Sequence, residues 1–458
     1  MYSCPLAMTD AAANTIEVNG LTERLPEAMA RLTSRDPERF WTSGQWMTEK
    51  GGGSDVATGT ETIAVPSGNA EDEYRLYGYK WFSSATDSDM SLTLARVVDR
   101  EGGGMVEGNK GLSMFFVRTR RPDDGGLNGI EVAKLKEKLG TRQLPTAELL
   151  LDGCEAIRLS QPGRGIPTIS SMLSVSRFHN TVMSVASMRK VTFLARDYAR
   201  RRRAFGRALC DHVLHGQALA RMEAETRGCM ALMLDLARQM GLEDCGKIGE
   251  EDRLLLRLMT PVAKMYTAKA VVAISSEGLE CFGGQGYIEE TGLPGILRDA
   301  QVLPIWEGTS NVMSLDVLRS ASKSGGAVMD ALRARVWRTC GEGRRSADAV
   351  VAGAAAEVEA AAAATLQFLT HNPRLAEVGA RDLTVSLARI YIATLLLEHC
   401  LSGSAVAGDA SDRTTLRLWL EKELAPVVAN FEKGSYEDDV NSYKSYVLEG
   451  YDENNLSN

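Results

Sequence analysis

The sequence lacks the features that mark several protein classes. Only 13 of its 458 residues are proline, and 44% are hydrophobic against 24% charged, which is the composition of a folded chain rather than a disordered or collagenous one. Lys and Arg number 52 against 60 Asp and Glu, so the overall basic charge that suits nucleic acid or anionic membranes is missing. We expect two or three folded domains, and any binding of nucleic acid would need a local basic patch.

Long apolar runs and targeting signals are also missing. The longest uncharged apolar stretch, Ala360–Pro373, is shorter than the roughly 18–20 residues of a membrane span, so we expect no span. No basic side chain precedes Arg24, and neither a secretory signal nor a transit peptide is visible. The mitochondrial matrix and the cytoplasm both stay open as locations.

The cysteines form no Cys-x-x-Cys pair and have no neighbouring histidine cluster, so the sequence predicts neither a disulfide framework nor a zinc site. We expect reduced, buried thiols and no metal ion. The eight cysteines are Cys4, Cys154, Cys210, Cys229, Cys245, Cys281, Cys340 and Cys400.

The first half of the chain is rich in short strand-like runs between Trp46 and Leu159. Clusters of Gly, Asp, Asn and Pro separate these runs, and no helix-length periodic segment interrupts them. This pattern favours an antiparallel β-barrel or sandwich over a parallel sheet with crossover helices. The expected strands are Tyr74–Phe82, Ser91–Val98, Leu112–Arg118 and Ala147–Leu151.

After Pro167 the apolar residues recur at helical spacing, which predicts a four-helix bundle. The expected helices are Ile169–Tyr198, His212–Met240, Arg253–Leu279 and Asp299–Ser320. A Ser-Gly junction at 322–326 leads to a net acidic helical extension with helices expected at Val350–Leu369 and Leu383–Leu401. The predicted fold class is therefore α+β, with domains at 1–44, 45–160, 161–320 and 321–458.

A glycine-rich segment, Met47–Val56, stands at the entry to the β-block. Adjacent glycines let a backbone approach a ligand and expose its N–H groups. The segment matches neither the P-loop nor the dinucleotide-binding pattern, and a plain hairpin explains it equally well. A second glycine cluster, Gly283–Tyr287, ends a predicted helix, where a glycine cap is the simplest explanation.

Two further segments carry reactive or charged groups. Glu307 follows Ile305 and Trp306, which we expect to desolvate its carboxyl group and raise its pKa above about 4.3, as a general base requires; a capping or ion-paired carboxylate is the alternative. Arginines crowd Tyr198–Arg207 at a helix end, where the helix dipole favours cations. Such a cluster also suits a pyrophosphate or a nucleic-acid backbone.

Taken together, these segments resemble the acyl-CoA dehydrogenase family, and most closely its AidB-like branch. The family's motifs occur in order at Met47–Val56, Gly78–Ser84, Tyr198–Gly206 and Phe282–Gly286, followed by Arg298-Asp299 and Trp306–Thr309. The resemblance implies a helical N-terminal domain, a middle β-domain and a four-helix domain in dimers or tetramers. Only about 45 residues precede Trp46, so it implies a shortened N-terminal domain.

The resemblance implies an FAD cofactor. The residues matching the family's cofactor contacts are Gln45, Met47, Thr48, Gly53, Ser54, Trp81, Ser83, Arg202, Phe205, Glu280, Gly283, Gly284, Thr309 and Asn311. Arg202 and Phe205 match contacts made to the cofactor of a neighbouring subunit. The family more often has Gln at the positions of Glu280 and Asn311.

The resemblance also implies the chemistry. Glu307 matches the base that removes the α-proton of an acyl-CoA while the β-hydride passes to the flavin, and the product is a trans-2-enoyl-CoA. Ser54, Ser174, Arg177 and Gly308 match substrate contacts, although Ser174 replaces an acidic residue, and an electron-transfer flavoprotein is the expected acceptor. The alternatives are an AidB-like flavoprotein that binds nucleic acid or sequesters acyl-CoA, and an inactive paralogue.

Overall fold

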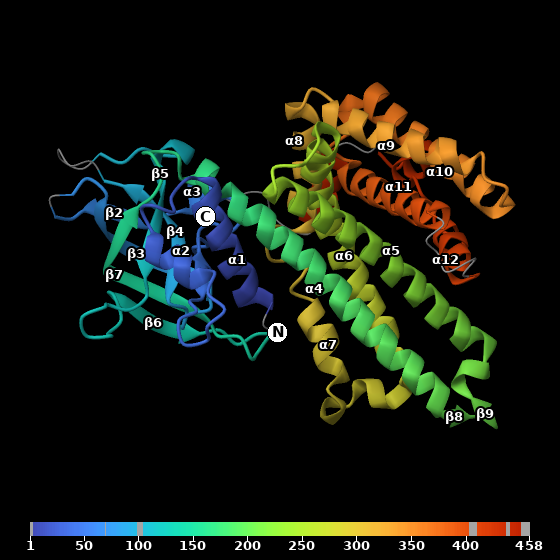
Figure 1. Cartoon of the computed structure of the whole chain (residues 1–458), viewed down its shortest axis with the longest axis horizontal. Coiled ribbons are helices and arrows are strands. Elements are labelled where there is room, and N and C mark those ends of the chain that lie inside the picture. Colours follow the sequence, from blue (N-terminus) through green and yellow to red (C-terminus); the bar gives the residue numbers. More distant parts are fainter. Residues whose placement is uncertain (1–2, 69, 99–103, 403–409, 437–439, 450–458) are drawn as a thin grey trace. The chain divides into compact units, whose positions relative to one another are not determined.

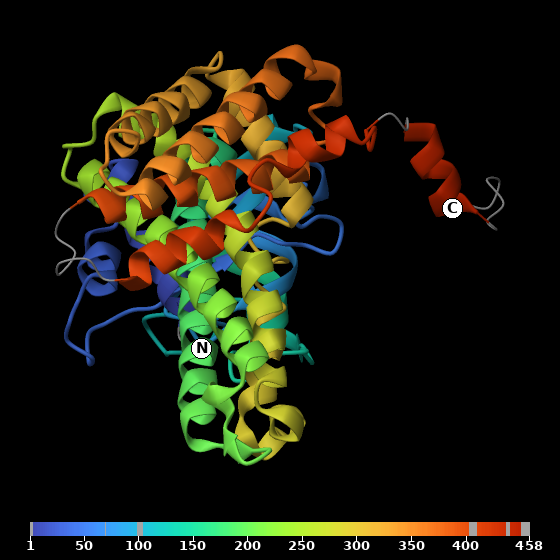
Figure 2. The same ribbon diagram turned by 90° about the vertical axis from the view of Figure 1, so that its right-hand side faces the viewer.

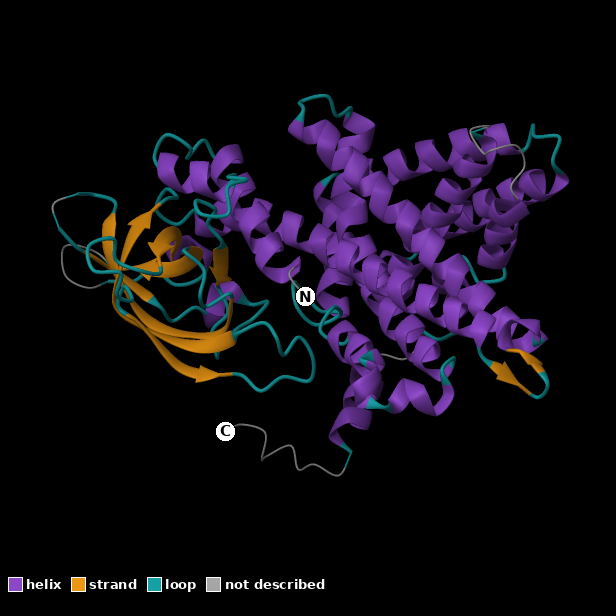
Figure 3. Cartoon of the chain, turned by 60° about the horizontal axis from the view of Figure 1, so that its bottom comes forward, coloured by secondary structure: helices purple, strands orange, loops and turns teal. Residues whose placement is uncertain are grey.

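The computed structural model describes residues 3–68, 70–98, 104–402, 410–436 and 440–449, with the side chains of 440–442 excepted. The chain forms two compact units (Figure 1). Unit 1 comprises Met1–Met183 and Pro294–Gly308, and unit 2 comprises Ser184–Leu293 and Thr309–Asn458. The strands belong to unit 1, apart from one short hairpin in unit 2 (Figure 3).

Unit 1 contains a seven-stranded sheet and several helices. Its strands are β1 (Ser43–Trp46), β2 (Ile63–Pro66), β3 (Glu73–Ser84), β4 (Met90–Val97), β5 (Leu112–Arg118), β6 (Ile130–Leu135) and β7 (Thr146–Arg158). Its helices are α1 (Ser3–Val18), α2 (Pro26–Leu32), α3 (Val56–Gly59), the start of α4 (Gly165–Arg201) and α7 (Leu293–Ala300). A 3₁₀ turn, η1, spans Asn109–Gly111.

The sheet closes on itself, as the expected β-barrel requires. Strands β4, β2, β3, β7 and β5 follow one another by hydrogen bonding, and β5 pairs with both β7 and β4. The four expected strands are confirmed as β3, β4, β5 and β7. The purely antiparallel prediction is wrong in part, because β1 and β2 both pair with β4 in parallel. The chain returns to each parallel partner through the strands that lie between them in sequence, so no long crossover helix is needed.

Alternation along the strands places the apolar core of unit 1 inside the barrel. In β3, Tyr74 and Leu76 are buried, whereas Arg75 between them is exposed, as the two-residue period of a strand requires. Trp46 of β1 and Phe115 of β5 join the same cluster. The short β1 therefore has a buried anchor just ahead of the glycine-rich segment.

Most of the expected helices are confirmed, but the helix predicted over Asp299–Ser320 is confirmed only from Ser310 onward. Helix α7 ends at Ala300 and α8 (Ser310–Lys323) begins after nine residues of turn. Glu307 and Gly308 in that turn have φ angles of 60° and 104°, which a right-handed helix cannot contain. Pro304 also lacks the N–H that a continuing helix needs.

Unit 2 combines the remaining bundle helices with the C-terminal extension (Figure 2). Beyond α4 and α8, its helices are α5 (Val213–Asp244), α6 (Glu250–Glu280), α9 (Ala327–Gly343), α10 (Ala349–His371), α11 (Ala380–Leu401), α12 (Ala410–Leu420), α13 (Pro426–Glu432) and α14 (Val440–Leu448). Shorter elements are β8 (Arg203–Ala204), β9 (Arg207–Ala208), η2 (Leu209–Asp211), η3 (Gly283–Tyr287), η4 (Glu289–Thr291) and η5 (Pro373–Leu375).

Helix α11 joins the extension to the bundle in one core. It packs against α5, α6 and α8 as well as α9 and α10. Tyr391 of α11 donates a 2.6 Å hydrogen bond to Asp235 of α5, and Arg335 of α9 pairs with Glu398 of α11 at 2.5 Å. Buried polar groups need such partners, so these contacts specify how α11 docks.

The expectation that no helix could span a membrane needs correction. Helices α10 and α11 are both long and apolar enough by composition to do so. An uncharged run is too strict a criterion, because a span tolerates a few charged residues. In α11, 72% of the most apolar window is buried inside the unit, against 33% in α10. The burial of α11 is typical of a helix in the core of a domain.

The cysteines are free thiols, and burial is confirmed for Cys154, Cys229, Cys281 and Cys340. The prediction of burial is wrong for Cys210 and Cys245, which are exposed. Cys210 lies in the turn before α5 and Cys245 caps the end of that helix. Both lie in connecting segments, which run mostly over the surface of a protein.

Candidate functional site

The glycine-rich segment is a tight turn, so the interpretation of its backbone as a hairpin is confirmed. Glu49 and Gly52 exchange two N–H···O bonds of 3.2 Å. A Cβ atom at Gly52 would lie 2.5 Å from the Asp55 carbonyl oxygen, so only glycine fits there. Asp55 then caps α3 by accepting a bond from the Thr58 N–H. The turn presents Ser54 on the surface.

This turn lies directly beside β3. The Trp81 N–H donates to the Thr48 carbonyl at 2.9 Å, and the next inward residue of the strand, Ser83, is fully buried. Within the described residues, neither the Ser83 Oγ nor the Gln45 Oε1 has a hydrogen-bond partner. Buried polar atoms are almost always satisfied. These two therefore fit a polar ligand placed against β1 and β3, where the resemblance implies the flavin.

A buried ion pair fastens the turn to the strand. The Lys80 Nζ lies 2.6 Å from the Glu49 Oε1, and the two side chains are 0% and 3% exposed. Glu49 also accepts from the N–H groups of Glu61 and Thr62 and from the Thr62 hydroxyl. Burial lowers the pKa of Lys80, and the Glu49 carboxylate opposes that shift. The pair fixes the spacing between the glycine turn and Trp81.

The indole of Trp81 is flanked by lysines. The Lys136 Nζ lies 3.4 Å from the ring centroid and the Lys50 Nζ lies 5.7 Å from it. Lys136 also pairs with Glu148 at 2.6 Å, and Tyr79 donates to the same carboxylate. The hydrogen bond from Lys136 and, to a smaller extent, that from Tyr79 lower the pKa of Glu148. Cations over an aromatic face attract its quadrupole, so the ring has a defined orientation.

Glu307 lies in the strained turn after α7, with its side chain half-buried. The Ser176 hydroxyl of α4 donates to the Glu307 Oε2 at 2.7 Å, and the Arg177 Nε donates to the Glu307 carbonyl oxygen at 3.4 Å. A non-glycine residue at positive φ persists only where its surroundings hold it. Consecutive residues of α4 therefore hold both the backbone and the carboxylate of Glu307.

Helix α1 lies between this carboxylate and the end of β3. The thiol of Cys4 hydrogen-bonds to Ser84, the residue after Ser83, and lies within electrostatic range of Glu307 and Lys138. Burial chiefly, and then the Glu307 charge, raise the pKa of Cys4 to about 12. The thiol of Cys4 therefore joins the start of α1 to the end of β3, within electrostatic range of the Glu307 turn in unit 1.

The loop after β6 supports the Glu307 turn from another side. The Thr141 N–H donates to Asp299 Oδ1 at 2.6 Å. A Cβ atom at Gly140 would lie 2.3 Å from the Arg298 carbonyl oxygen, so the two backbones are in direct contact. The Arg298-Asp299 pair of the family motif thus anchors the segment that leads to Glu307.

Several expectations for unit 1 fail or change. Ile305 is 63% exposed, so it does not shield the carboxylate as expected, because the backbone reversal turns it outward. Ser174 is exposed and bonds the Ser170 carbonyl. Ser176 was missed, since a serine within a helical pattern gives no signal until the chain that faces it is known.

The remaining expected cofactor residues lie in unit 2 and are exposed. Phe205 is 96% exposed at the tip of the β8–β9 hairpin, with a φ angle of 50°, and Arg202 precedes it. The ring meets His212 edge-on, with 6.1 Å between the ring centroids, and the rest of its surface stays open. The exposed residues of this set are Arg202, Phe205, Glu280, Gly283, Gly284, Thr309 and Asn311.

Three family profiles match the chain. Residues 44–154 match "Acyl-CoA dehydrogenase, middle domain", residues 163–322 match "Acyl-CoA dehydrogenase, C-terminal domain", and residues 327–448 match "Acyl-CoA dehydrogenase 11 C-terminal domain-like". Together these profiles cover most of the chain.

Known proteins agree. "Acyl-CoA dehydrogenase family member 11" of Caenorhabditis elegans is 47% identical over 93% of this chain and 69% of its own length. The crystal structure of C. elegans ACDH-11 in complex with C11-CoA superposes with a TM-score of 0.90 at 43% identity, covering 98% of this chain and 76% of that one. "Putative acyl-CoA dehydrogenase AidB" of Escherichia coli is 36% identical over 70% of this chain and 58% of its own length.

The expected likeness to AidB is therefore present but weaker than the likeness to the nematode protein, which also accounts for the C-terminal extension. The chain spans about two thirds of the length of the nematode relative. The barrel, the helical domain and the extension thus have the acyl-CoA dehydrogenase architecture. The chain belongs to the acyl-CoA dehydrogenase family of oxidoreductases, which act on CH–CH groups.

Proposed function

We propose that this chain catalyses the FAD-dependent α,β-dehydrogenation of an acyl-CoA to a trans-2-enoyl-CoA, with Glu307 as the base. The observation that carries this proposal is the position of Glu307 in unit 1. Its carboxylate accepts a hydrogen bond from Ser176 and lies within electrostatic range of Cys4, whose thiol hydrogen-bonds to Ser84 at the end of β3. A base close to the proposed flavin contacts at Trp81 and Ser83 suits removal of an α-proton.

FAD, when bound, accepts the β-hydrogen as a hydride and stores the two electrons. Gln45 and Ser83 offer buried unpaired oxygens to its polar ring edge, and Trp81 bounds the same place. Met47, Thr48, Gly53 and Ser54 on the adjoining turn would complete the contacts from unit 1. A flavin that carries the redox step leaves the protein the tasks of orientation and water exclusion.

The residues exposed in unit 2 would contact the cofactor of a second copy. Phe205 on its strained hairpin and the neighbouring Arg202 suit an adenosine ring and a pyrophosphate. Glu280, Gly283 and Gly284 would lie near them, with Thr309 and Asn311 as further contacts. We therefore propose a homodimer or homotetramer.

The proton moves to the protein in this scheme. Glu307 takes the α-proton as the C–H bond breaks, and the electron pair stays on the substrate as enolate-like charge. A backbone N–H aimed at the thioester oxygen stabilises that charge. Ser54, Arg177, Gly308 and Ser174 are the proposed substrate contacts. Arg177 also fixes the backbone of Glu307, so its substitution would disturb the base as well.

The substrate is a medium, long or branched acyl thioester in this proposal, and an electron-transfer flavoprotein is the proposed acceptor. The support for the thioester is the nematode structure, which holds C11-CoA and superposes over nearly the whole of this chain. An acyl chain of that kind would lie with its Cα near Glu307.

The test is anaerobic titration of the FAD-loaded protein with acyl-CoAs of graded length. Reduction bleaches the visible flavin band, and the enoyl product appears in equal amount. The proposal requires bleaching by at least one of these thioesters. A protein that cannot be loaded with FAD, or a flavin that no acyl-CoA reduces, overturns it.

Nucleic-acid binding is the second candidate, motivated by the exposed arginines at 200–203 and by the likeness to AidB. Two of these arginines already have partners, since Arg201 pairs with Asp197 and Arg203 donates to the Gly206 carbonyl. The extension is net acidic, which opposes phosphate binding. Titration with a DNA duplex at two salt concentrations tests this candidate. Binding to the phosphate backbone should weaken steeply as the salt concentration rises, and the absence of salt-sensitive binding would eliminate the candidate.

A further inference from the structure

Ser176 has two acceptors within reach of one hydroxyl proton. Its Oγ lies 2.7 Å from the Glu307 Oε2 and 3.2 Å from the Leu173 carbonyl oxygen one turn earlier in α4. The residue is 0% exposed, so water does not compete for either bond. A serine hydroxyl donates one proton and accepts through two lone pairs.

The shorter contact is to the charged partner. A hydrogen bond to an ionised carboxylate is stronger than one to a neutral carbonyl, so the hydroxyl points at Glu307 while that carboxylate is ionised. Once the carboxyl group is protonated, it can donate to the Ser176 oxygen, and the serine proton can turn to Leu173. Both protonation states then keep a satisfied contact.

We propose that Ser176 is a positioning residue that holds the Glu307 side chain in the same place before and after proton transfer by redirecting its hydroxyl between Glu307 and Leu173. The inference rests on the proposed function, because it concerns the base of that reaction. The step balances within the site. The substrate C–H bond breaks, an O–H bond forms on Glu307, and the serine hydroxyl rotates without losing its proton.

Other groups also face Glu307. Arg177 of α4 donates to its backbone carbonyl, and Cys4 of α1 lies within electrostatic range of its carboxylate, with Lys138 near that thiol. These groups stay unchanged when Ser176 is altered. A shift in the behaviour of Glu307 on substitution of Ser176 therefore reports the loss of this hydroxyl.

The experiment compares Ser176→Ala, Ser176→Thr and the control Ser170→Ala in the FAD-loaded protein. Ser170 lies on the same helix and is exposed, and its hydroxyl bonds the Pro167 carbonyl. Rapid mixing with an acyl-CoA at several pH values gives the rate constant of flavin reduction, and the spectral change gives the acyl-CoA affinity.

In Ser176→Ala we expect the reduction rate constant to fall about tenfold at the acidic end of the profile, with an apparent pKa about one unit higher, because a bond that favoured the ionised carboxylate is gone. Acyl-CoA affinity should change less than about twofold, and Ser176→Thr, which keeps the hydroxyl, should recover most of the rate. Infrared titration of the Glu307 carboxyl band, assigned with Glu307→Gln, should show the same pKa shift in the protein without substrate.

Unchanged rate and pKa in Ser176→Ala, or a Ser176→Thr variant as slow as the alanine variant, overturns the inference. A shift equal to that of Ser170→Ala does the same. These failures differ from failure of the proposed function, in which acyl-CoA would leave the wild-type flavin oxidised. If Ser176→Ala does not fold, Ser176→Thr and the infrared titration still decide the question.

Discussion

Removing the ammonium group of Lys80 should destabilise unit 1 severely. The Lys80→Met side chain has similar length but leaves the Glu49 carboxylate buried without its cation, only 3% exposed. Three protein donors, from Glu61 and Thr62, stay on that carboxylate, so it keeps hydrogen bonds but loses its charge partner. Breaking a buried pair in this way typically costs about 3–5 kcal/mol.

The expected change in melting temperature follows from the size of the unit. For a domain of 150–250 residues, about 1 kcal/mol corresponds to roughly 2–4 °C, so we expect Lys80→Met to lower the Tm by about 6–20 °C. Thermal melting followed by tryptophan fluorescence reports on unit 1 through Trp46 and Trp81. FAD affinity should fall as well, because the pair connects the glycine turn to β3.

Two variants make the test specific. Lys134→Met, at an exposed position of β6, makes the same chemical change without a buried partner and should leave the Tm unchanged. The double variant Glu49→Gln/Lys80→Met removes the uncompensated charge and should recover at least half of the loss. A Lys80→Met protein that melts within about 1 °C of the wild type would refute the reasoning.

Further predictions concern unit 2. In the native protein, Cys210 and Cys245 should react rapidly with a thiol reagent, whereas the buried Cys229, whose pKa burial raises, should react only after unfolding; early labelling of Cys229 on mass analysis would contradict its position. A hydrogen bond from Arg238 is the main cause of the lowered pKa of Asp252. Its stabilising contribution is thus present above the unfolded pKa of about 3.9 and lost as the pH falls through the lower folded value. Asp252→Asn should therefore lower the Tm more at pH 7 than in acid, and an equal loss at both pH values would contradict this assignment.

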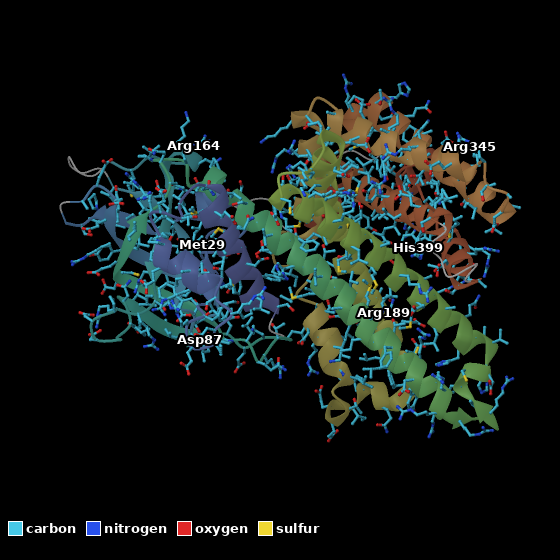
Figure 4. The ribbon with its side chains drawn as sticks, in the orientation of Figure 1. Met29, Asp87, Arg164, Arg189, Arg345 and His399 are labelled. Atoms are coloured by element: carbon cyan, nitrogen blue, oxygen red, sulfur yellow. The ribbon has the colours of Figure 1, made fainter. Side chains whose placement is uncertain are left out.

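Ion pairs elsewhere in unit 2 follow the same rule. Arg189 of α4 (Figure 4) pairs with Glu223 of α5 at 2.8 Å. Burial raises the pKa of Glu223, but hydrogen bonds from Arg227 and Arg189 outweigh it, and the net shift is downward. The contacts between α4 and α5 should therefore weaken only in acid, as those around Asp252 do.

The sequence pattern is enough to predict the long elements. Strands such as Leu112–Arg118 and helices such as α11 have periodic burial, which hydrophobic spacing reports directly. The short β1 and β2 were missed, because four residues are too few for a period. Strand β6 was missed too, because its residues after Ile130 are all exposed and show no alternation. The glycine-rich turn and Trp81 were found because their motifs are local in sequence.

The geometry around Glu307 could not be predicted from the sequence. A helix was expected through it, since its apolar neighbours fit a helical spacing, but the left-handed backbone at Glu307 and Gly308 depends on contacts from α4. That reversal is also why Ile305 points outward rather than over the carboxylate. Ser176 became recognisable only once the two segments, 131 positions apart in sequence, were side by side.

The most direct test of the account is the Glu307→Gln variant loaded with FAD and mixed anaerobically with the acyl-CoA that best bleaches the wild-type flavin. The amide keeps the size of the side chain but cannot take a proton from the α-carbon. We predict that FAD stays bound, that the thioester still perturbs the flavin spectrum, and that the flavin band does not bleach. Reduction at a rate close to that of the wild type would contradict the assignment of Glu307 as the base.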